Sequence, residues 1–257
     1  MSSIANAAFH ASDALAGLPL FQGVEADVLR EVAAAARLAQ HDKGEVFLPQ
    51  GHEVSRFFIV LDGWCGASKD NAEGKESLLQ LFHRGDFLPD PEQAARIEVS
   101  PLSLRALTPV RLLTLPPPVV RNAIERSGVF KGNMLTVAMR RCRELRDHIE
   151  QLTLRSAEQR VGRFMLQMRL HAGTAREDIR LPFDKALIAA YLGIKPETLS
   201  RTLQSFKDKG FIVERNQLTA PHHQALCGYC DTATMALCPY ADTVECTCPT
   251  HDHATAP

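Results

Sequence analysis

The stretch from Asp184 to Gly210 constrains the fold most, because it carries the signals of two helices joined by a tight turn. Asp184 is a good N-cap for a first helix that ends at Leu192. Gly193 supplies the turn, and Pro196 occupies the first position of the second helix, where a missing N–H has no consequence. This spacing predicts a helix-turn-helix.

The second predicted helix, with Pro196 at its first position, separates its apolar from its polar residues. Leu199, Leu203 and Phe206 fall on the inward face. The outward positions are polar and include one arginine: Glu197, Thr198, Ser200, Arg201 and Gln204. Residues 211–220, FIVERNQLTA, then predict a two-stranded wing.

The net charge of -1 hides a gradient along the chain. Residues 155–214 contain more Lys and Arg than Asp and Glu, whereas residues 220–257 contain no Lys or Arg and four acidic residues. A basic segment before an acidic tail is typical of a nucleic-acid contact confined to one domain. The charge favours a DNA-binding motif over the alternative, a helical hairpin with no role in DNA binding.

Between residues 43 and 116 the pattern changes to short β-rich runs, namely EVFLP, RFFIVLDG, SLLQLF and VRLLTLP. Glycines separate these runs: Gly44, Gly51, Gly63, Gly74 and Gly85. Strands of this length with turns at this spacing predict a small antiparallel barrel or roll, although periodicity alone leaves other all-β folds open. Residues 18–41, before this block, are predicted to form short helices.

Three consecutive prolines, 116–118, end the β-rich block, and a helix is predicted to follow. An apolar seam with alternating steps of three and four residues runs along it: Leu135, Ala138, Cys142, Leu145, Ile149 and Leu152. This period is typical of two helices that pair in a coiled coil. The helix could instead pack on its own domain, but its place between two domains favours a symmetric homodimer.

Five of the seven cysteines lie in the last part of the chain: Cys227, Cys230, Cys238, Cys246 and Cys248. In a reducing compartment such a cluster is more often a metal site than a disulfide framework. Thiolates suit iron–sulfur clusters and zinc alike, and the spacing is not a standard zinc pattern. On the residues alone, an iron–sulfur cluster, zinc, haem and a thiol redox switch all stay open.

Together these segments resemble the CRP/FNR family of regulators, to about residue 226. KGEVFLPQGHEVSRFFIVLDGWCG and LLQLFHRGDFL are similar to the sensory roll of that family, and the seam helix is similar to its dimerisation helix. SAEQRVGRFML and LPFDKALIAAYLGIKPETLSRTLQSFKDKGFI are similar to its winged helix-turn-helix. The resemblance implies an α+β chain with an N-terminal antiparallel β-roll of the cyclic-nucleotide-binding type, a long dimerisation helix and a C-terminal winged helix-turn-helix. The expected domains are residues 1–118 for the N-terminal helices and roll, 119–153 for the dimerisation helix, 154–220 for the DNA-binding domain and 221–257 for a Cys-rich tail.

Glu197, Ser200 and Arg201 fall on the E-x-x-S-R pattern of the FNR branch, whose members recognise TTGAT half-sites. The chemistry agrees, because arginine can donate twice to guanine O6 and N7 and glutamate can accept from the amine of cytosine. Lys195 and Gln204 are better placed for backbone phosphates, which fix register. The resemblance implies double-stranded DNA, a second copy of the chain and RNA polymerase as partners.

The same resemblance bears on the signal. CRP-type members bind cyclic AMP through an arginine and its neighbour in the roll, but Ser100 and Pro101 occupy those positions here. A buried phosphate without an arginine is poorly compensated, so we expect no binding of cyclic AMP.

Some FNR-like regulators hold a [4Fe–4S] cluster on a C-terminal run of cysteines. The similar tail implies an oxygen- or redox-responsive cluster on Cys227, Cys230 and Cys238, with Cys246 or Cys248 as the fourth ligand and zinc or haem as alternatives. Without a metal, we expect the tail to be unstructured.

No nucleophile–base constellation, phosphate loop or pair of catalytic carboxylates is present, so we do not expect an enzyme. The N-terminus has neither a basic n-region nor an apolar h-region, and no apolar run is long enough for a membrane span. We therefore expect a cytoplasmic protein with no membrane partner. The alternative to a DNA-binding regulator is a sensor or adaptor whose roll acts on a protein partner.

Overall fold

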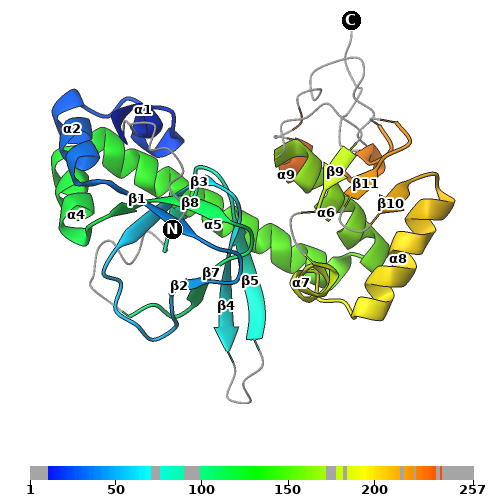
Figure 1. The fold of residues 1–257 in the computed structure, drawn as a ribbon. Helices are drawn as coiled ribbons and strands as arrows, with labels where there is room; N and C mark the ends of the chain where they lie inside the picture. The colour runs from blue at the N-terminus through cyan, green and yellow to red at the C-terminus, as the bar shows by residue number, and fades with distance from the viewer. Residues whose placement is uncertain are drawn as a thin grey trace, which may run out of the picture. The chain divides into compact units, whose positions relative to one another are not determined.

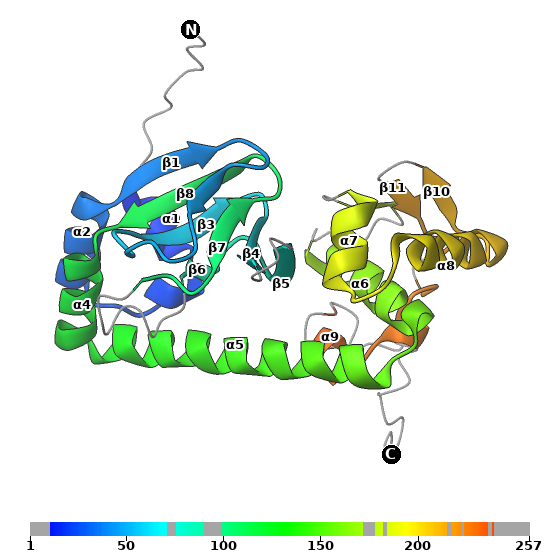
Figure 2. The same cartoon turned by 90° about the horizontal axis from the view of Figure 1, so that it is seen from below.

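The computed structural model describes residues 11–70, 76–89, 99–171, 178–181, 184–214, 217–222, 224–235 and 238. Cys246 and Cys248 lie outside the described residues. The chain divides into two compact units, residues 1–144 and 145–257. Figures 1 and 2 show the elements of each unit from two directions.

The first unit contains an antiparallel β-roll made of two four-stranded sheets. In strand order, one sheet consists of β1 (Arg37–His41), β8 (Val110–Leu115), β3 (Phe57–Asp62) and β6 (Phe87–Leu88). The other consists of β2 (Val46–Leu48), β7 (Ser103–Ala106), β4 (Cys65–Asp70) and β5 (Glu76–Phe82). Phe57, Ile59, Leu104 and Leu113 are among the fully buried core residues. The predicted roll is confirmed, and each of the four predicted β-rich runs supplies a strand.

The N-terminal segment is helical only in part. Its helices are α1 (Ala11–Ala16), the short 3-10 helix η1 (Pro19–Phe21) and α2 (Ala26–Ala35). The prediction of short helices for residues 18–41 is wrong after Ala36, because Arg37–His41 pair with the five residues from Val110 to Thr114 as a strand. The backbone bonds made in this distant pairing outweigh the local helical pattern.

Two helices follow the β-rich block, and the first begins within the three prolines. The first, α4 (Pro117–Arg126), ends where Ser127 takes an extended conformation, and the second is α5 (Gly128–Leu154). The Ser127 hydroxyl accepts from the Phe130 N–H at 3.0 Å, at the start of α5. One face of α5 packs on the roll through Phe130 and Met134. Neither α5 nor any other helix in the described part of the chain combines the length and apolar character needed to cross a membrane.

The second unit contains the helix-turn-helix. Its helices are α6 (Ala157–His171), α7 (Lys185–Tyr191) and α8 (Pro196–Asp208). The Asp184 side chain caps α7 by accepting from the Leu187 N–H at 2.9 Å. Gly193 makes the turn with a φ of 60°, a conformation that glycine adopts without strain. The predicted cap, turn and helix pair are confirmed.

The wing has one more strand than the local sequence predicts. In strand order, its antiparallel sheet consists of β10 (Ile212–Glu214), β11 (Gln217–Thr219) and β9 (Asp178–Arg180). The hairpin of β10 and β11 matches the prediction. The third strand comes from the segment between α6 and α7, and its pairing with β11 is set by tertiary structure.

The first part of the tail is ordered. The 3-10 helix η2 (Cys227–Tyr229) and the short helix α9 (Thr232–Met235) pack against α6. Leu226 and Thr234 are fully buried there. This segment therefore buries its own side chains against the DNA-binding domain, and the expectation that the tail is unstructured without a metal stays a prediction.

Candidate nucleic-acid interface

The second helix of the motif, α8, presents a polar face to solvent and an apolar face to its own domain. Leu199, Leu203 and Phe206 are at most 4% exposed. Five of the six predicted DNA-contact residues are exposed: Lys195, Glu197, Ser200, Arg201 and Gln204. The sixth, Thr198, is half-buried, and its carbonyl accepts from the Thr202 hydroxyl at 2.9 Å. The structure thus leaves Glu197, Ser200 and Arg201 available on one helix.

The turn between α7 and α8 is held from outside the motif. Arg160 of α6 donates from Nη1 to the Leu192 carbonyl at 2.9 Å. A Cβ added at Gly193 would lie 2.9 Å from the Leu152 side chain of α5, so glycine also permits a close approach there. Arg160 has no signal in the sequence beyond its place in the SAEQR run.

The seam predicted on α5 is exposed in the single chain. Leu135 and Ile149 leave 59% and 61% of their surface in solvent. Leu145, Leu152 and Cys142 are also exposed, and Ala138 is half-buried. An apolar stripe of this length in solvent is typical of a surface that a partner covers.

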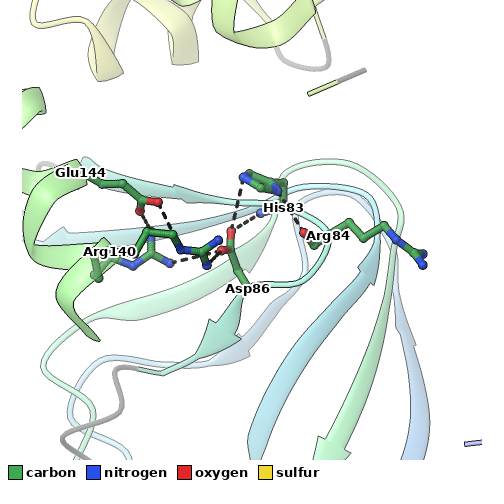
Figure 3. Close-up of polar contacts among 6 residues, drawn as sticks. His83, Arg84, Asp86, Arg140 and Glu144 are labelled. Atoms are coloured by element: carbon green, nitrogen blue, oxygen red, sulfur yellow. Dashed lines mark hydrogen bonds and ion pairs between the residues drawn. The ribbon is translucent and has the colours of Figure 1, made fainter. Parts of the chain in front are cut away.

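A buried carboxylate joins the roll to α5, and Figure 3 shows Asp86 between His83 and Arg140. Asp86 is 1% exposed, and its Oδ1 lies 2.7 Å from Arg140 Nη2 and 4.0 Å from Arg141 Nη2. Its Oδ2 accepts from the His83 N–H at 2.8 Å. Glu144 pairs with both arginines. The sequence does not predict this ion pair, because no local pattern links the turn that contains Asp86 to the arginines of α5.

The cysteines differ in their environments. Cys65 in β4 is fully buried, and burial raises the pKa of its thiol to about 12, so it is a neutral core residue. Cys227 and Cys230 lie one turn apart, since the Cys230 N–H donates to the Cys227 carbonyl at 3.0 Å. Cys227 and Cys238 are half-buried, and Cys230 is 8% exposed. Among the described residues, no three His, Cys, Asp or Glu side chains gather as a metal site.

The roll contains a small pocket, lined by Ala67, Gln80, Phe82, Pro89, Ser100, Pro101, Leu102 and Leu104. Two of these residues, Ser100 and Pro101, are the ones aligned with the phosphate-binding pair. The Ser100 hydroxyl donates to the Leu102 carbonyl at 2.6 Å, and Pro101 has no N–H to offer. The described residues leave space for about one water molecule.

Comparisons with known proteins match both units. The model of the cyclic nucleotide-binding domain matches residues 39–127, and the model of the Crp-like helix-turn-helix domain matches residues 159–229. The nitrogen fixation regulation protein FixK of Bradyrhizobium diazoefficiens is 28% identical over 192 residues, which cover 74% of this chain and 79% of FixK. The transcriptional activator protein anr of Pseudomonas aeruginosa is 26% identical over 199 residues, which cover 76% of this chain and 80% of anr.

The fold also has solved counterparts. The structure of FixK2 from Bradyrhizobium japonicum superposes with a TM-score of 0.66 at 20% identity, and the match covers 74% of this chain and 95% of FixK2. The solved counterpart shares the fold, and the match to the Crp-like helix-turn-helix domain together with the two relatives supports a DNA-binding transcription regulator. The two domain matches and the two relatives support a regulator of the CRP/FNR family.

Proposed function

We propose that this protein is a homodimeric transcription regulator that recognises palindromes with TTGAT-like half-sites through α8. The exposure of Glu197, Ser200 and Arg201 on one helix with a buried apolar back carries the proposal. In this arrangement the polar face is free to enter a major groove while the apolar face holds the helix on its domain.

Each residue of the exposed face has a defined task. Arg201 donates to guanine O6 and N7, and Glu197 accepts from the exocyclic amine of cytosine. Ser200 is short enough to approach a base edge. Lys195, just before α8, contacts a phosphate, as does Gln204, whose amide also donates to Asp208 Oδ1 at 3.2 Å.

The α5 seam supports the homodimer. Pairing with a second copy would cover the exposed side chains of Leu135, Leu145, Ile149 and Leu152. A two-fold axis along this helix would also present two copies of α8 to the two half-sites of a palindrome. The regulator would act in the cytoplasm, with RNA polymerase as its partner in transcription.

Fluorescence anisotropy at moderate salt tests the recognition. The wild type should prefer a TTGAT palindrome over a scrambled palindrome of the same composition. Arg201→Ala should weaken specific binding by about 1–3 kcal/mol and relax the preference at one guanine. Arg146→Ala removes an equal charge from α5 and should leave the sequence preference unchanged. Equal affinity of the wild type for both palindromes would contradict the proposal.

For the signal, we propose a [4Fe–4S] cluster held by Cys227, Cys230 and Cys238, with Cys246 or Cys248 as the fourth ligand. The donor set fits, because thiolates suit iron–sulfur clusters and the first two cysteines have the spacing of a chelating pair. The burial of Cys230 beside the half-buried Cys227 gives the pair partial shielding from water. When bound, such a group would supply an oxygen-sensitive redox centre next to the DNA-binding domain.

Protein purified without oxygen tests the cofactor. We expect iron and acid-labile sulfide, broad visible absorption, and the loss of both on Cys230→Ala. DNA affinity should change on exposure of the wild type to air. A sharp Soret band would show that the cofactor is haem. Bound zinc in a colourless protein would show that the metal is zinc. The proposal would be contradicted if the wild type contained no iron and its DNA affinity did not change on exposure to air.

A further inference from the structure

The tail contacts α6 first through the ring of Tyr229. The ring packs on the helix backbone at Gly162, where an added Cβ would overlap three of its carbon atoms. The Tyr229 hydroxyl donates to Glu158 Oε1 at 2.9 Å and accepts from Lys209 Nζ at 3.3 Å. Lys209 is the C-cap of α8 and also pairs with Glu158. One polar network therefore joins the tail, α6 and the end of the helix proposed to contact DNA.

The second contact passes through Arg163, which is 7% exposed. Its guanidinium pairs with the Asp231 carboxylate of the tail and also faces Gln151, whose side-chain oxygen can accept from it. Gln151 is buried near the end of α5, and Arg163 lies in α6. Arg163 therefore bridges the corner between these two helices and the tail.

The carboxylate of Asp231 uses both of its oxygens. One pairs with Arg163, and the other accepts from the Thr234 N–H at 2.9 Å and lies 2.7 Å from the Thr234 hydroxyl, at the start of α9. The same hydroxyl lies 3.5 Å from Cys230 Sγ. A change at Cys230 therefore acts on the side chains that hold the tail in place.

We propose that residues 226–235 form a tail latch that fixes the α5–α6 corner and the C-terminal end of α8 in the arrangement that binds DNA. Arg163 is the positioning residue at the corner, and Tyr229 acts at the end of α8. The latch is built from contacts between side chains of this chain. The inference rests on the proposed DNA-binding function and adds a route by which the tail regulates it.

Two variants separate the latch from the general stability of the helices. Gly162→Ala raises the helix propensity of α6 but expels the Tyr229 ring, and Gly132→Ala, in α5, is the matched control because a Cβ there meets nothing within 4 Å. Asp231→Asn removes the charge that faces Arg163, and Asp62→Asn removes an exposed charge from β3 as its control.

Full-length protein purified without oxygen, with its bound metal retained, is compared by hydrogen exchange with mass spectrometry and by binding to the TTGAT palindrome. Both latch variants should exchange at least tenfold faster in residues 226–235 and at the α5–α6 corner, and should bind DNA about tenfold more weakly. Both controls should behave as the wild type.

Unchanged exchange in the two latch variants would overturn the latch. Faster exchange with unchanged DNA affinity would overturn its positioning role. If the wild type binds no DNA, the proposed function fails, while the exchange measurement still decides whether the tail is held by these contacts.

Discussion

At the scale of single residues, two buried charges connect elements that are far apart in the chain. Asp86 links the turn before β6 to the arginines of α5, and Arg163 links α6 to Gln151 and to the tail. Burying a charge costs free energy unless partners compensate it. Each of these residues therefore favours the arrangement in which its partners are in place.

Asp86→Asn should lower the free energy of unfolding by about 1–3 kcal/mol, because it leaves Arg140 and Arg141 without their buried carboxylate. Arg140 is partly exposed, which limits the loss. Urea denaturation measures the change, and Asp62→Asn, at an exposed position, should stay within about 0.5 kcal/mol of the wild type. Equal midpoints and slopes for all three proteins would show that the ion pair contributes nothing.

His148 should make stability depend on pH. Burial lowers the pKa of this imidazole, and the nearby positive charge of Arg163 lowers it further. The ring stacks on Tyr191, with 4.5 Å between the ring centres. Because the pKa in the folded state lies below the ordinary value of 6.5, the unfolded state binds more protons just below that value. The contribution of His148 to the free energy of unfolding is therefore fully present above pH 6.5 and is lost as the pH falls below that value.

Replacing His148 by Phe keeps a ring on Tyr191 but removes the titration. Between pH 7 and about pH 5.5, the melting temperature of the wild type should fall by more than that of His148→Phe. The reason is that only the wild-type ring gains a proton on unfolding. His52→Gln, at an exposed position, serves as the control. The same slope in His148→Phe and the wild type would contradict this assignment.

At the scale of elements, α5 is a helix with two apolar faces. Phe130 and Met134 pack into the core of the roll, while Leu135 and Ile149 lie in solvent in the single chain. The packed face explains how the helix is held to its own domain. No described segment of the chain covers the exposed face, and a second copy of the chain would cover it.

Ile149→Glu should dissociate the proposed homodimer. Each dimer would bury two unpaired carboxylates in its seam, a cost on the order of 3 kcal/mol, or about a hundredfold in the dissociation constant. Sedimentation velocity over a range of concentrations measures this shift. Arg143→Glu, at an exposed position beside the seam, should stay dimeric. A monomeric wild type, or a dimer unaffected by Ile149→Glu, would show that the seam is not the interface.

At the scale of the whole molecule, the chain carries a roll matched by the cyclic nucleotide-binding domain and a matched helix-turn-helix. The roll keeps the architecture but offers no arginine at Ser100 or Pro101 for a phosphate. Five of the seven cysteines follow the DNA-binding domain, and Cys65 in the roll is a buried core residue. We therefore expect the tail, and not the roll, to sense the signal.

Millimolar cyclic AMP should change neither the melting temperature nor the DNA affinity. A ligand at 100 times its dissociation constant stabilises the folded state by about 2.7 kcal/mol, which differential scanning fluorimetry would detect. Cyclic GMP, of similar size and charge, tests the same site. A clear upward shift with either nucleotide would show that the roll binds it without the expected arginine.

The sequence by itself determined the elements that depend on neighbouring residues. Asp184, Gly193 and Pro196 specify the cap, the turn and the start of α8 through local backbone preferences. The buried positions Leu199, Leu203 and Phe206 follow from helical periodicity. The exposed face of α8 and the seam of α5 follow from the same rule, so most of the candidate DNA interface could be predicted.

Only the tertiary structure decided the contacts between distant segments. Arg37–His41 become β1 because β8 pairs with them, and β9 joins the wing because β11 offers it an edge. Asp86 meets Arg140 across 54 residues of sequence, and Arg163 meets Asp231 between α6 and the tail. No local propensity encodes such a pair, because its free energy depends on the burial and the partners that appear only when the whole chain has folded.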